Sequence, residues 1–291
     1  MAITAALVKE LRDRTGAGMM ECKKALTVTD GDIDIAIENM RKAGAAKADK
    51  KSGRITAEGK VSYAISADDK KAAMVEVNCE TDFAASNEDL IEFVDTACQL
   101  VLEHSPKDVE ALNALTLADG STVNTMREAL IGKIGENIQV RRFEQVTAEG
   151  SFAVYQHGVK IAVLVDYSGG DSALGKDIAM HVAASRPLCI SEDQVPQVSR
   201  DKEKEIFTAQ ARESGKPDNI IEKMIDGRMR KYLAEITLLG QAFIKEPDMS
   251  VSKLLDSKKA SVHSFICYEV GEGIEKKVEN FADEVSAQMK D

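Results

Sequence analysis

The feature that most constrains the fold is an order of elements that occurs twice. Each copy has two short segments of alternating apolar and polar residues joined by a turn, followed by a segment with helical periodicity. The segments of the first copy are residues 61–65, 73–79 and 87–102, and those of the second are residues 152–155, 159–167 and 174–184. Two hairpins, each followed by a helix, predict an α+β fold with a pseudo-duplicated hairpin-plus-helix core, in which each sheet is covered on one face by its helix.

Composition limits the class of protein. The chain has 291 residues, 44% of them hydrophobic, which is enough for several modules with cores of their own. A net charge of −11, no tryptophan and only 4% aromatic residues argue against a nucleic-acid partner, because such partners need basic and stacking surfaces. Five scattered cysteines without a CxxC pair are typical of a reducing compartment, and no secretory or membrane-spanning pattern is present. We therefore expect a cytoplasmic protein with no membrane partner.

The rest of the chain is expected to be mainly helical. Apolar stripes predict three short helices in residues 4–54, the last running from Asp32 to a C-cap at Gly44 and followed by a polar connector or a helix extension. Two charged helices between residues 199 and 233 have few apolar positions and predict a projecting helical hairpin that packs on itself. An apolar stripe from Ile274 to Val285 predicts a final helix that docks on another surface.

These patterns predict five domains. They are residues 1–55 (N-terminal three-helix bundle and connector), 56–143 (core subdomain N), 144–190 with 238–272 (core subdomain C), 191–237 (helical hairpin, a coiled-coil or dimerisation module) and 273–291 (C-terminal helical module).

The stretch after the second strand of the first copy is the most informative for function. By alternation, one face of residues 73–79 is apolar and the other is polar or mixed. A capping box that begins at Ser86 starts the next helix, so residues 81–85 must turn between two rigid elements. Asp82 and Phe83 stand side by side in this turn, and rigid flanks let a short loop present side chains at little ordering cost. This predicts a presented probe; the alternative is that Phe83 fills the core beneath the helix.

One motif suggests a different function. Residues 170–176 have the GxxxxGK spacing of a phosphate-binding loop between a strand and a helix. The next residue is Asp177, where a hydroxyl should bind magnesium, and an anion there would repel the phosphates. The histidines and cysteines lack metal-ligand spacing, and no carboxylate pair is placed for acid–base work. We therefore expect no cofactor, no metal and no enzyme, and keep a P-loop nucleotide-binding enzyme using Lys176 as the alternative.

Five stretches of the chain resemble the translation elongation factor Ts family. They are RTGAGMMECKKAL at residues 14–26, NCETDF at 78–83, YQHG at 155–158, HVAASRP at 181–187 and VGEGIEK at 270–276. They occur in order along the whole chain, and the first two together are highly specific. The sequence departs from the family at Ala84, where a larger aliphatic residue is usual, and at Ala242, where proline is usual. We expect the first departure to trim the apolar contact beside Phe83 and the second to loosen the turn before Ile244.

The resemblance implies a guanine-nucleotide exchange factor that binds elongation factor Tu and promotes GDP release during translation elongation. The residues implied to displace magnesium and to wedge into the partner are Thr81, Asp82, Phe83 and Ala84. A GTPase holds its nucleotide through backbone amides, a lysine and magnesium, so a factor that distorts this site needs no chemistry of its own.

The resemblance also implies further contacts. A UBA-like N-terminal bundle would dock on the GTPase domain, and the turn at His157 and Gly158 would touch a second domain. The bundle residues implied are Arg12, Met19, Met20 and Lys23, although each methionine could instead pack in the bundle core. The helical hairpin is implied in self-association, giving a homodimer or a two-plus-two complex, and the C-terminal helix in a further contact. A UBA-like adaptor that binds without promoting exchange is a third possibility.

Overall fold

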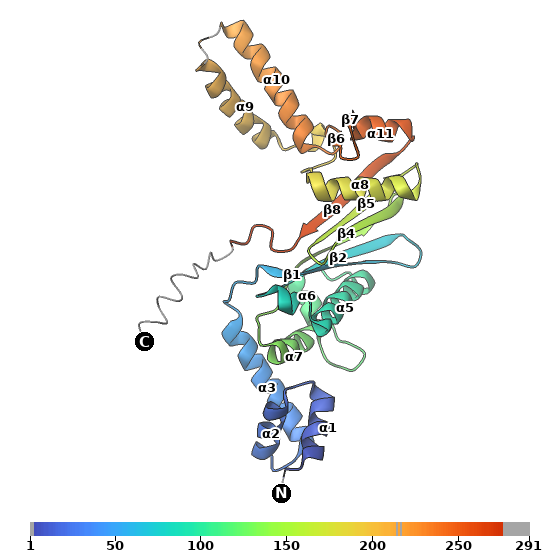
Figure 1. Ribbon diagram of the computed structural model, residues 1–291. Coiled ribbons are helices and arrows are strands. Elements are labelled where there is room, and N and C mark those ends of the chain that lie inside the picture. The colour runs from blue at the N-terminus through green and yellow to red at the C-terminus, as the bar shows by residue number, and fades with distance from the viewer. Residues whose placement is uncertain (1–2, 214, 216, 276–291) are drawn as a thin grey trace. The chain divides into compact units, whose positions relative to one another are not determined.

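The computed structural model describes residues 3–213, 215 and 217–275, which form a mixed α+β chain of two compact units (Figure 1). Among the described residues, the first unit holds 3–64, 73–145 and 269–275, and the second holds 65–72 together with 146–268. The predicted mixed α+β class is confirmed. The five-domain division and the UBA-like character of the bundle remain predictions, and the predicted final helix lies outside the described residues.

The first unit begins with the three predicted helices, α1 (Ala5–Thr15), α2 (Met19–Val28) and α3 (Ile33–Lys51). They enclose a small core whose fully buried members include Leu11, Cys22 and Leu26. The predicted end of the third helix at Gly44 is wrong, because α3 continues to Lys51. Gly44 is buried where α3 packs on α7 (Val123–Ile134), and a Cβ there would lie 3.5 Å from the carbonyl oxygen of Glu128. The glycine permits close helix packing, and the expected helix extension is the one observed.

The first sheet has the strand order β1-β2-β3, formed by β1 (Glu58–Ile65), β2 (Lys71–Cys79) and β3 (Gln139–Thr147). Val75 and Val77 of β2 pack with Phe93 and Val94 of α5 (Glu88–His104) in one core cluster, to which α7 and α6 (Val109–Ala114) also contribute. Figure 1 shows these helices on one side of the sheet. The predicted hairpin and helix are therefore confirmed, whereas α6, α7 and β3 were not predicted.

Two details of the first copy differ from the sequence prediction. The face of β2 expected to be polar or mixed is buried as well, because it carries Met74 and a buried carboxylate, Glu76, that is neutralised by ion pairs to Arg141 and Arg142. The helix cap is Asn87, whose side chain accepts a hydrogen bond from Asp89 N at 2.9 Å, and not Ser86. The turn therefore extends one residue further than the capping box predicted.

The second unit repeats the scheme. Its sheet has the order β4-β5-β8, formed by β4 (Ser151–His157), β5 (Ile161–Ser168) and β8 (Ser261–Glu269), and β4 pairs antiparallel with β5. Helix α8 (Ser172–Ser185) packs on the face of β5 that carries Val163, Val165 and Tyr167. A small ribbon of β6 (Ala242–Phe243) and β7 (Glu246–Ser250), followed by α11 (Val251–Ser257), completes this core.

The helical hairpin and the turn before Ile244, both expected from the sequence, lie in the second unit. Helices α9 (Gln197–Arg212) and α10 (Asp218–Ile236) form the predicted hairpin and pack on each other, with Ala211, Ile221 and Ile225 buried between them. The segment before Ile244, where Ala242 was expected to loosen the turn, is held by a hydrogen bond from Ile244 N to His181 Nδ1 of 3.2 Å. The ribbon shows a register shift at residues 242 and 243.

Candidate partner-binding site

The predicted corner, residues 81–84, forms the start of a one-turn helix, α4 (Asp82–Ala85). Thr81 is extended and caps this turn, since its side-chain oxygen accepts a hydrogen bond from Ala84 N at 3.2 Å. Phe83 is 86% exposed and Asp82 beside it is exposed too. The alternative that Phe83 fills the core is therefore wrong in this structure. An aromatic side chain this exposed on a short, capped turn is available for contact with another molecule.

Ala84 differs from the other three predicted corner residues. Its side chain is buried in the core of the first unit, together with Ala85 and Leu90, whereas Thr81, Asp82 and Phe83 face solvent. Because Ala84 packs in the core and Phe83 faces solvent, the small side chain at position 84 affects how α4 packs on the core. It does not contribute to the apolar surface beside Phe83. The structure places Ala84 beneath the presented surface and not on it.

The corner is held by a residue that the sequence did not reveal. The Glu136 carboxylate, in the loop after α7, accepts hydrogen bonds from Glu80 N (3.0 Å), Thr81 N (2.9 Å) and Thr81 Oγ1 (2.6 Å). In return the Glu80 carboxylate accepts from Asn137 N at 2.6 Å. Because 55 residues separate Thr81 and Glu136 in the chain, no local pattern could have signalled this contact.

The thiol of Cys79 supports the corner from the core side. Its Sγ donates a hydrogen bond of 3.1 Å to the carbonyl oxygen of Thr81. Burial, reinforced by the nearby negative charge of Glu136, raises the pKa of the Cys79 thiol to about 12. The thiol therefore keeps its proton at neutral pH and remains a hydrogen-bond donor.

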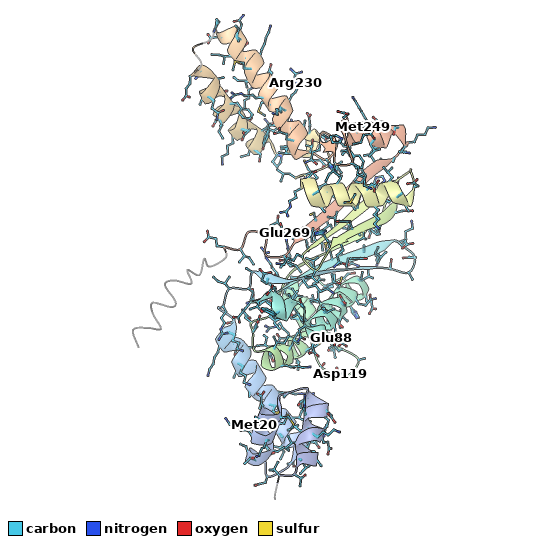
Figure 2. All side chains as sticks on the ribbon, viewed as in Figure 1. Met20, Glu88, Asp119, Arg230, Met249 and Glu269 are labelled. Atoms are coloured by element: carbon cyan, nitrogen blue, oxygen red, sulfur yellow. The ribbon has the colours of Figure 1, made fainter. Side chains whose placement is uncertain are left out.

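The four predicted bundle residues lie on the surface of α1 and α2. Met19 is 56% exposed and Met20 is 76% exposed, and Arg12 and Lys23 are exposed as well (Figure 2 labels Met20). The alternative that either methionine packs in the bundle core is wrong. Flexible, polarisable methionine side chains flanked by cations suit contact with a mixed apolar and acidic surface.

His157 and Gly158 form the turn between β4 and β5, in the second unit. His157 is the last residue of β4 and pairs with Ile161 across the hairpin, and its ring lies near Tyr155, whose hydroxyl is 3.1 Å from His157 Nδ1. Gly158 adopts a φ of +58°, which most side chains disfavour, so glycine suits this turn. Both residues are exposed, as a contact site requires.

The P-loop alternative does not match the local structure. A phosphate-binding loop must stay open before its helix, but residues 172–175 already belong to α8, which Asp171 caps by accepting from Leu174 N at 2.9 Å. Gly175 is buried against Tyr167, where a Cβ would lie 2.5 Å from the ring. Its lack of a side chain serves helix–sheet packing. Lys176 is exposed on the helix.

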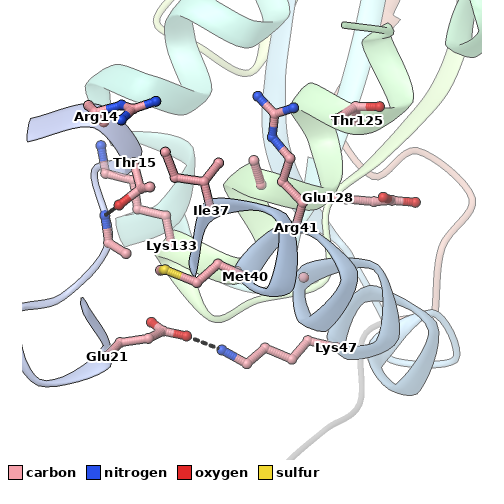
Figure 3. Close-up of a pocket in the computed structure, with 14 residues that line it drawn as sticks. Arg14, Thr15, Glu21, Ile37, Met40, Arg41, Lys47, Thr125, Glu128 and Lys133 are labelled. Atoms are coloured by element: carbon pink, nitrogen blue, oxygen red, sulfur yellow. Dashed lines mark hydrogen bonds and ion pairs between the residues drawn. The ribbon is translucent and has the colours of Figure 1, made fainter. Parts of the chain in front are cut away.

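A cavity of about 200 Å³ lies between the helical bundle and α7 in the first unit (Figure 3). It is lined by the apolar side chains of Ile37 and Met40 and by four cations, Arg14, Arg41, Lys47 and Lys133. Three of these have carboxylate partners, in the pairs Arg14–Asp34, Lys47–Glu21 and Lys133–Asp89. The cavity therefore has little unmatched charge with which to select a ligand.

Residues 3–213, 215 and 217–275 contain neither a metal-binding cluster nor a membrane-spanning helix. No group of three or more histidine, cysteine, aspartate or glutamate side chains is arranged to hold a metal ion within them. None of the described helices is both long and apolar enough to cross a membrane.

Comparison with known proteins identifies the class of this chain. The family model described as elongation factor TS matches residues 80–272. The elongation factor Ts of Thioalkalivibrio sulfidiphilus is 61% identical over 292 residues, covering 100% of this chain and 99% of its own. Those of Methylococcus capsulatus and Legionella pneumophila are 58% and 53% identical, with at least 99% of each chain covered. Such a chain is a translation elongation factor. It belongs to the elongation factor Ts family, as the sequence motifs predicted.

Proposed function

We propose that this chain is a guanine-nucleotide exchange factor that binds elongation factor Tu and promotes GDP release. The observation that carries the proposal is the 86% exposed Phe83, beside an exposed carboxylate at Asp82, on a turn fixed by hydrogen bonds at Thr81. Family membership supports a role in translation elongation, and a translation factor works in the cytoplasm, where we place it.

The proposed mechanism requires no chemistry from this chain. A GTPase holds GDP through backbone amides, a lysine and a magnesium ion, so a small displacement of these groups weakens nucleotide binding. The ring of Phe83 enters an apolar gap beside the partner's switch region, and the Asp82 carboxylate competes in the hydrogen-bond network that orients the magnesium ligands. Because the coupling is reciprocal, bound nucleotide must weaken the partner's affinity for the factor by the same ratio. Incoming GTP therefore releases the factor.

The geometry of the corner favours this role over simple adhesion. Burying a phenylalanine side chain stabilises a complex by about 1.5–3 kcal/mol. More of that free energy contributes to binding when the turn is already ordered, because no conformational entropy is then lost on insertion. Thr81 is fixed through its amide, its hydroxyl and its carbonyl oxygen, so the turn is ordered before binding.

Two other surfaces supply the affinity in this proposal. Met19, Met20, Arg12 and Lys23 dock the bundle on the GTPase domain, and His157 with Gly158 contacts a second domain. The exposure of all six residues supports this assignment. The α9–α10 hairpin, which leaves Val198, Ile206 and Ile220 exposed, serves self-association, so that the complex has one or two copies of each protein. Sedimentation of the complex at several concentrations tests the stoichiometry.

The proposal is tested by the release of fluorescent GDP from purified elongation factor Tu at increasing concentrations of this chain. We expect release to accelerate and then saturate. Binding of the partner without acceleration would support the adaptor and contradict exchange. Magnesium-dependent nucleotide binding by the chain alone would support the P-loop alternative.

Variants of the corner extend the test. Asp82→Ala with Phe83→Ala should slow factor-stimulated release by about ten- to hundredfold, the ratio that corresponds to one buried phenylalanine. Leu188→Ala is the matched control, because it removes a side chain that is 74% exposed in the second unit, outside the proposed contact surfaces. Equal release rates in the wild type and the corner variant would contradict the wedge.

A further inference from the structure

We propose that Glu136 is the positioning residue of the corner, and that its carboxylate keeps Asp82 and Phe83 in the orientation required for insertion. This inference rests on the proposed exchange function and names a residue of that same site outside residues 81–84. In this inference Glu136 orients the corner and does not itself contact the partner.

The contacts of Glu136 suit a carboxylate. One carboxylate oxygen, Oε2, accepts both backbone amides, from Glu80 at 3.0 Å and Thr81 at 2.9 Å. The other, Oε1, accepts from Thr81 Oγ1 at 2.6 Å. Three donors converge on a group that only accepts, and a charged acceptor makes such hydrogen bonds stronger. In a glutamine, the NH2 group either faces a backbone amide or makes Thr81 Oγ1 turn its proton away, and the negative charge that strengthens the hydrogen bonds is lost.

The hydrogen bond to Thr81 transmits this hold to the helix that carries Phe83. Thr81 Oγ1 gives its proton to Glu136, and the same oxygen accepts from Ala84 N at 3.2 Å to cap α4. Glu136 therefore fixes the Thr81 rotamer that makes the cap. Helix α4 is a single turn, Asp82–Ala85, and so short a helix has no stability of its own. Its orientation depends on its cap and on the burial of Ala84 and Ala85.

The loop that contains Glu136 also connects the corner to the C-terminal end of α3, the third helix of the bundle. Asn137 N donates to the Glu80 carboxylate at 2.6 Å, and Asn137 Nδ2 donates to the carbonyl oxygens of Ser52 (3.3 Å) and Arg54 (3.1 Å) just after α3. Lys51 Nζ, at the end of α3, donates to the carbonyl oxygen of Gly135. Both proposed contact surfaces of the first unit are thus tied to one short loop. Glu136 acts on the insertion of the corner and leaves the side chains of the bundle surface unchanged.

The test compares Glu136→Gln and Glu136→Ala with the wild-type chain in GDP release from elongation factor Tu, over a full range of factor concentrations. We expect the maximal release rate to fall about tenfold or more, as for the loss of a charge-assisted hydrogen bond. We expect the half-saturating concentration to change by less than about threefold, because the bundle surface is intact. Asp108→Ala is the matched control, since it removes a carboxylate that caps α6 in the same unit by accepting from Ala111 N at 2.7 Å.

Two further readouts separate positioning from general stability. In the Asp82→Ala/Phe83→Ala background, Glu136→Gln should cause no additional loss of release, because a residue that acts through the corner has nothing left to position. In the free chain, the amides of Glu80 and Thr81 should exchange hydrogen about tenfold faster in Glu136→Gln, and the melting temperature should fall no further than in Asp108→Ala.

The outcomes distinguish this inference from the proposed function. If the corner variant slows release but Glu136→Gln does not, Glu136 is not a positioning residue and the exchange function stands. If Glu136→Gln slows release equally with and without the corner side chains, it acts elsewhere and the inference is wrong. If the corner variant itself leaves release unchanged, the proposed exchange mechanism is contradicted, and the inference about Glu136, which rests on it, is contradicted as well.

Discussion

The two hairpin-plus-helix copies end their central strands in opposite ways. After β2, the chain forms a capped turn that presents Phe83 and Asp82 to solvent. After β5, Gly169 and Gly170 turn tightly with φ values of +76° and +65°, and a Cβ on Gly169 would lie 2.1 Å from the carbonyl oxygen of Lys259. The second turn is pressed against neighbouring backbone and has no side chain to present. A shared scaffold thus carries a presented corner in one copy and a closed turn in the other.

The interiors of the two copies are more alike. Each central strand carries a buried carboxylate, Glu76 in β2 and Asp166 in β5. Asp166 accepts from two backbone amides, those of Glu149 (2.8 Å) and Gly150 (3.0 Å). Glu76 accepts from Gly271 N at 2.9 Å and also pairs with two arginines. The comparison indicates that an acid in the central strand organises the surrounding chain in both copies, while the exposed turn is free to diverge.

The largest expected effect concerns these buried acids. Glu76→Gln should lower the free energy of unfolding of the first unit by about 3 kcal/mol, because it removes the buried counter-charge of Arg141 and Arg142, although Arg142 keeps its ion pair with the exposed Glu272. Asp166→Asn should cost the second unit about 1.5 kcal/mol, since it weakens hydrogen bonds to amides but strands no charge. Urea unfolding, with hydrogen exchange to assign the loss to a unit, measures both. A larger loss of unfolding free energy in Asp166→Asn than in Glu76→Gln would contradict the different roles assigned to the two buried acids.

The next largest effect concerns the packing of helix α8 on the second sheet. Gly175→Ala should destabilise the second unit by about 2 kcal/mol, because the added Cβ would lie 2.5 Å from Tyr167 and 2.8 Å from Ala153.

Gly227→Ala, in α10, is its control. Apart from the chain neighbours and the backbone of its own helix, no atom lies within 4 Å of the added Cβ, so the helix should be stabilised by up to about 1 kcal/mol. Thermal melts of the two variants should move in opposite directions, and a shift of the same sign would contradict the assigned packing role.

The smallest expected effect is a pH dependence of the second copy. His181 in α8 is buried, and burial lowers its pKa below the usual 6.5. Below that pH the unfolded chain binds a proton that folded His181 excludes. The free energy of unfolding of the second unit should therefore fall as pH drops from 7 toward 5, by at most about 1.4 kcal/mol per pH unit.

Urea midpoints across this range provide the measurement. His181→Gln should flatten the slope, whereas His104→Gln, at the exposed end of α5, should leave it unchanged. A slope that survives in His181→Gln would assign the pH dependence to another group.

The order of the elements could be read from the sequence, because alternation and helical periodicity report which side chains share a face. The exposure of Phe83 could not be decided from the sequence, since it depends on what the rest of the chain covers. The rigid flanks of the turn and the family resemblance favoured it, but burial beneath the helix stayed open. Gly44 misled for a related reason, as a glycine signals a helix end unless another helix packs against it, and α7 does so here. Glu136 and the arginine partners of Glu76 act over more than 50 residues of sequence, beyond any local pattern.

The central claim is that the presented corner weakens the partner's hold on nucleotide. The most direct measurement is the equilibrium dissociation constant of GDP for elongation factor Tu, alone and with a saturating amount of this chain. The account predicts that the chain raises this constant and that Asp82→Ala/Phe83→Ala, at saturation, loses about ten- to hundredfold of the increase. An increase of the same size with the wild-type and the variant chain would contradict the account.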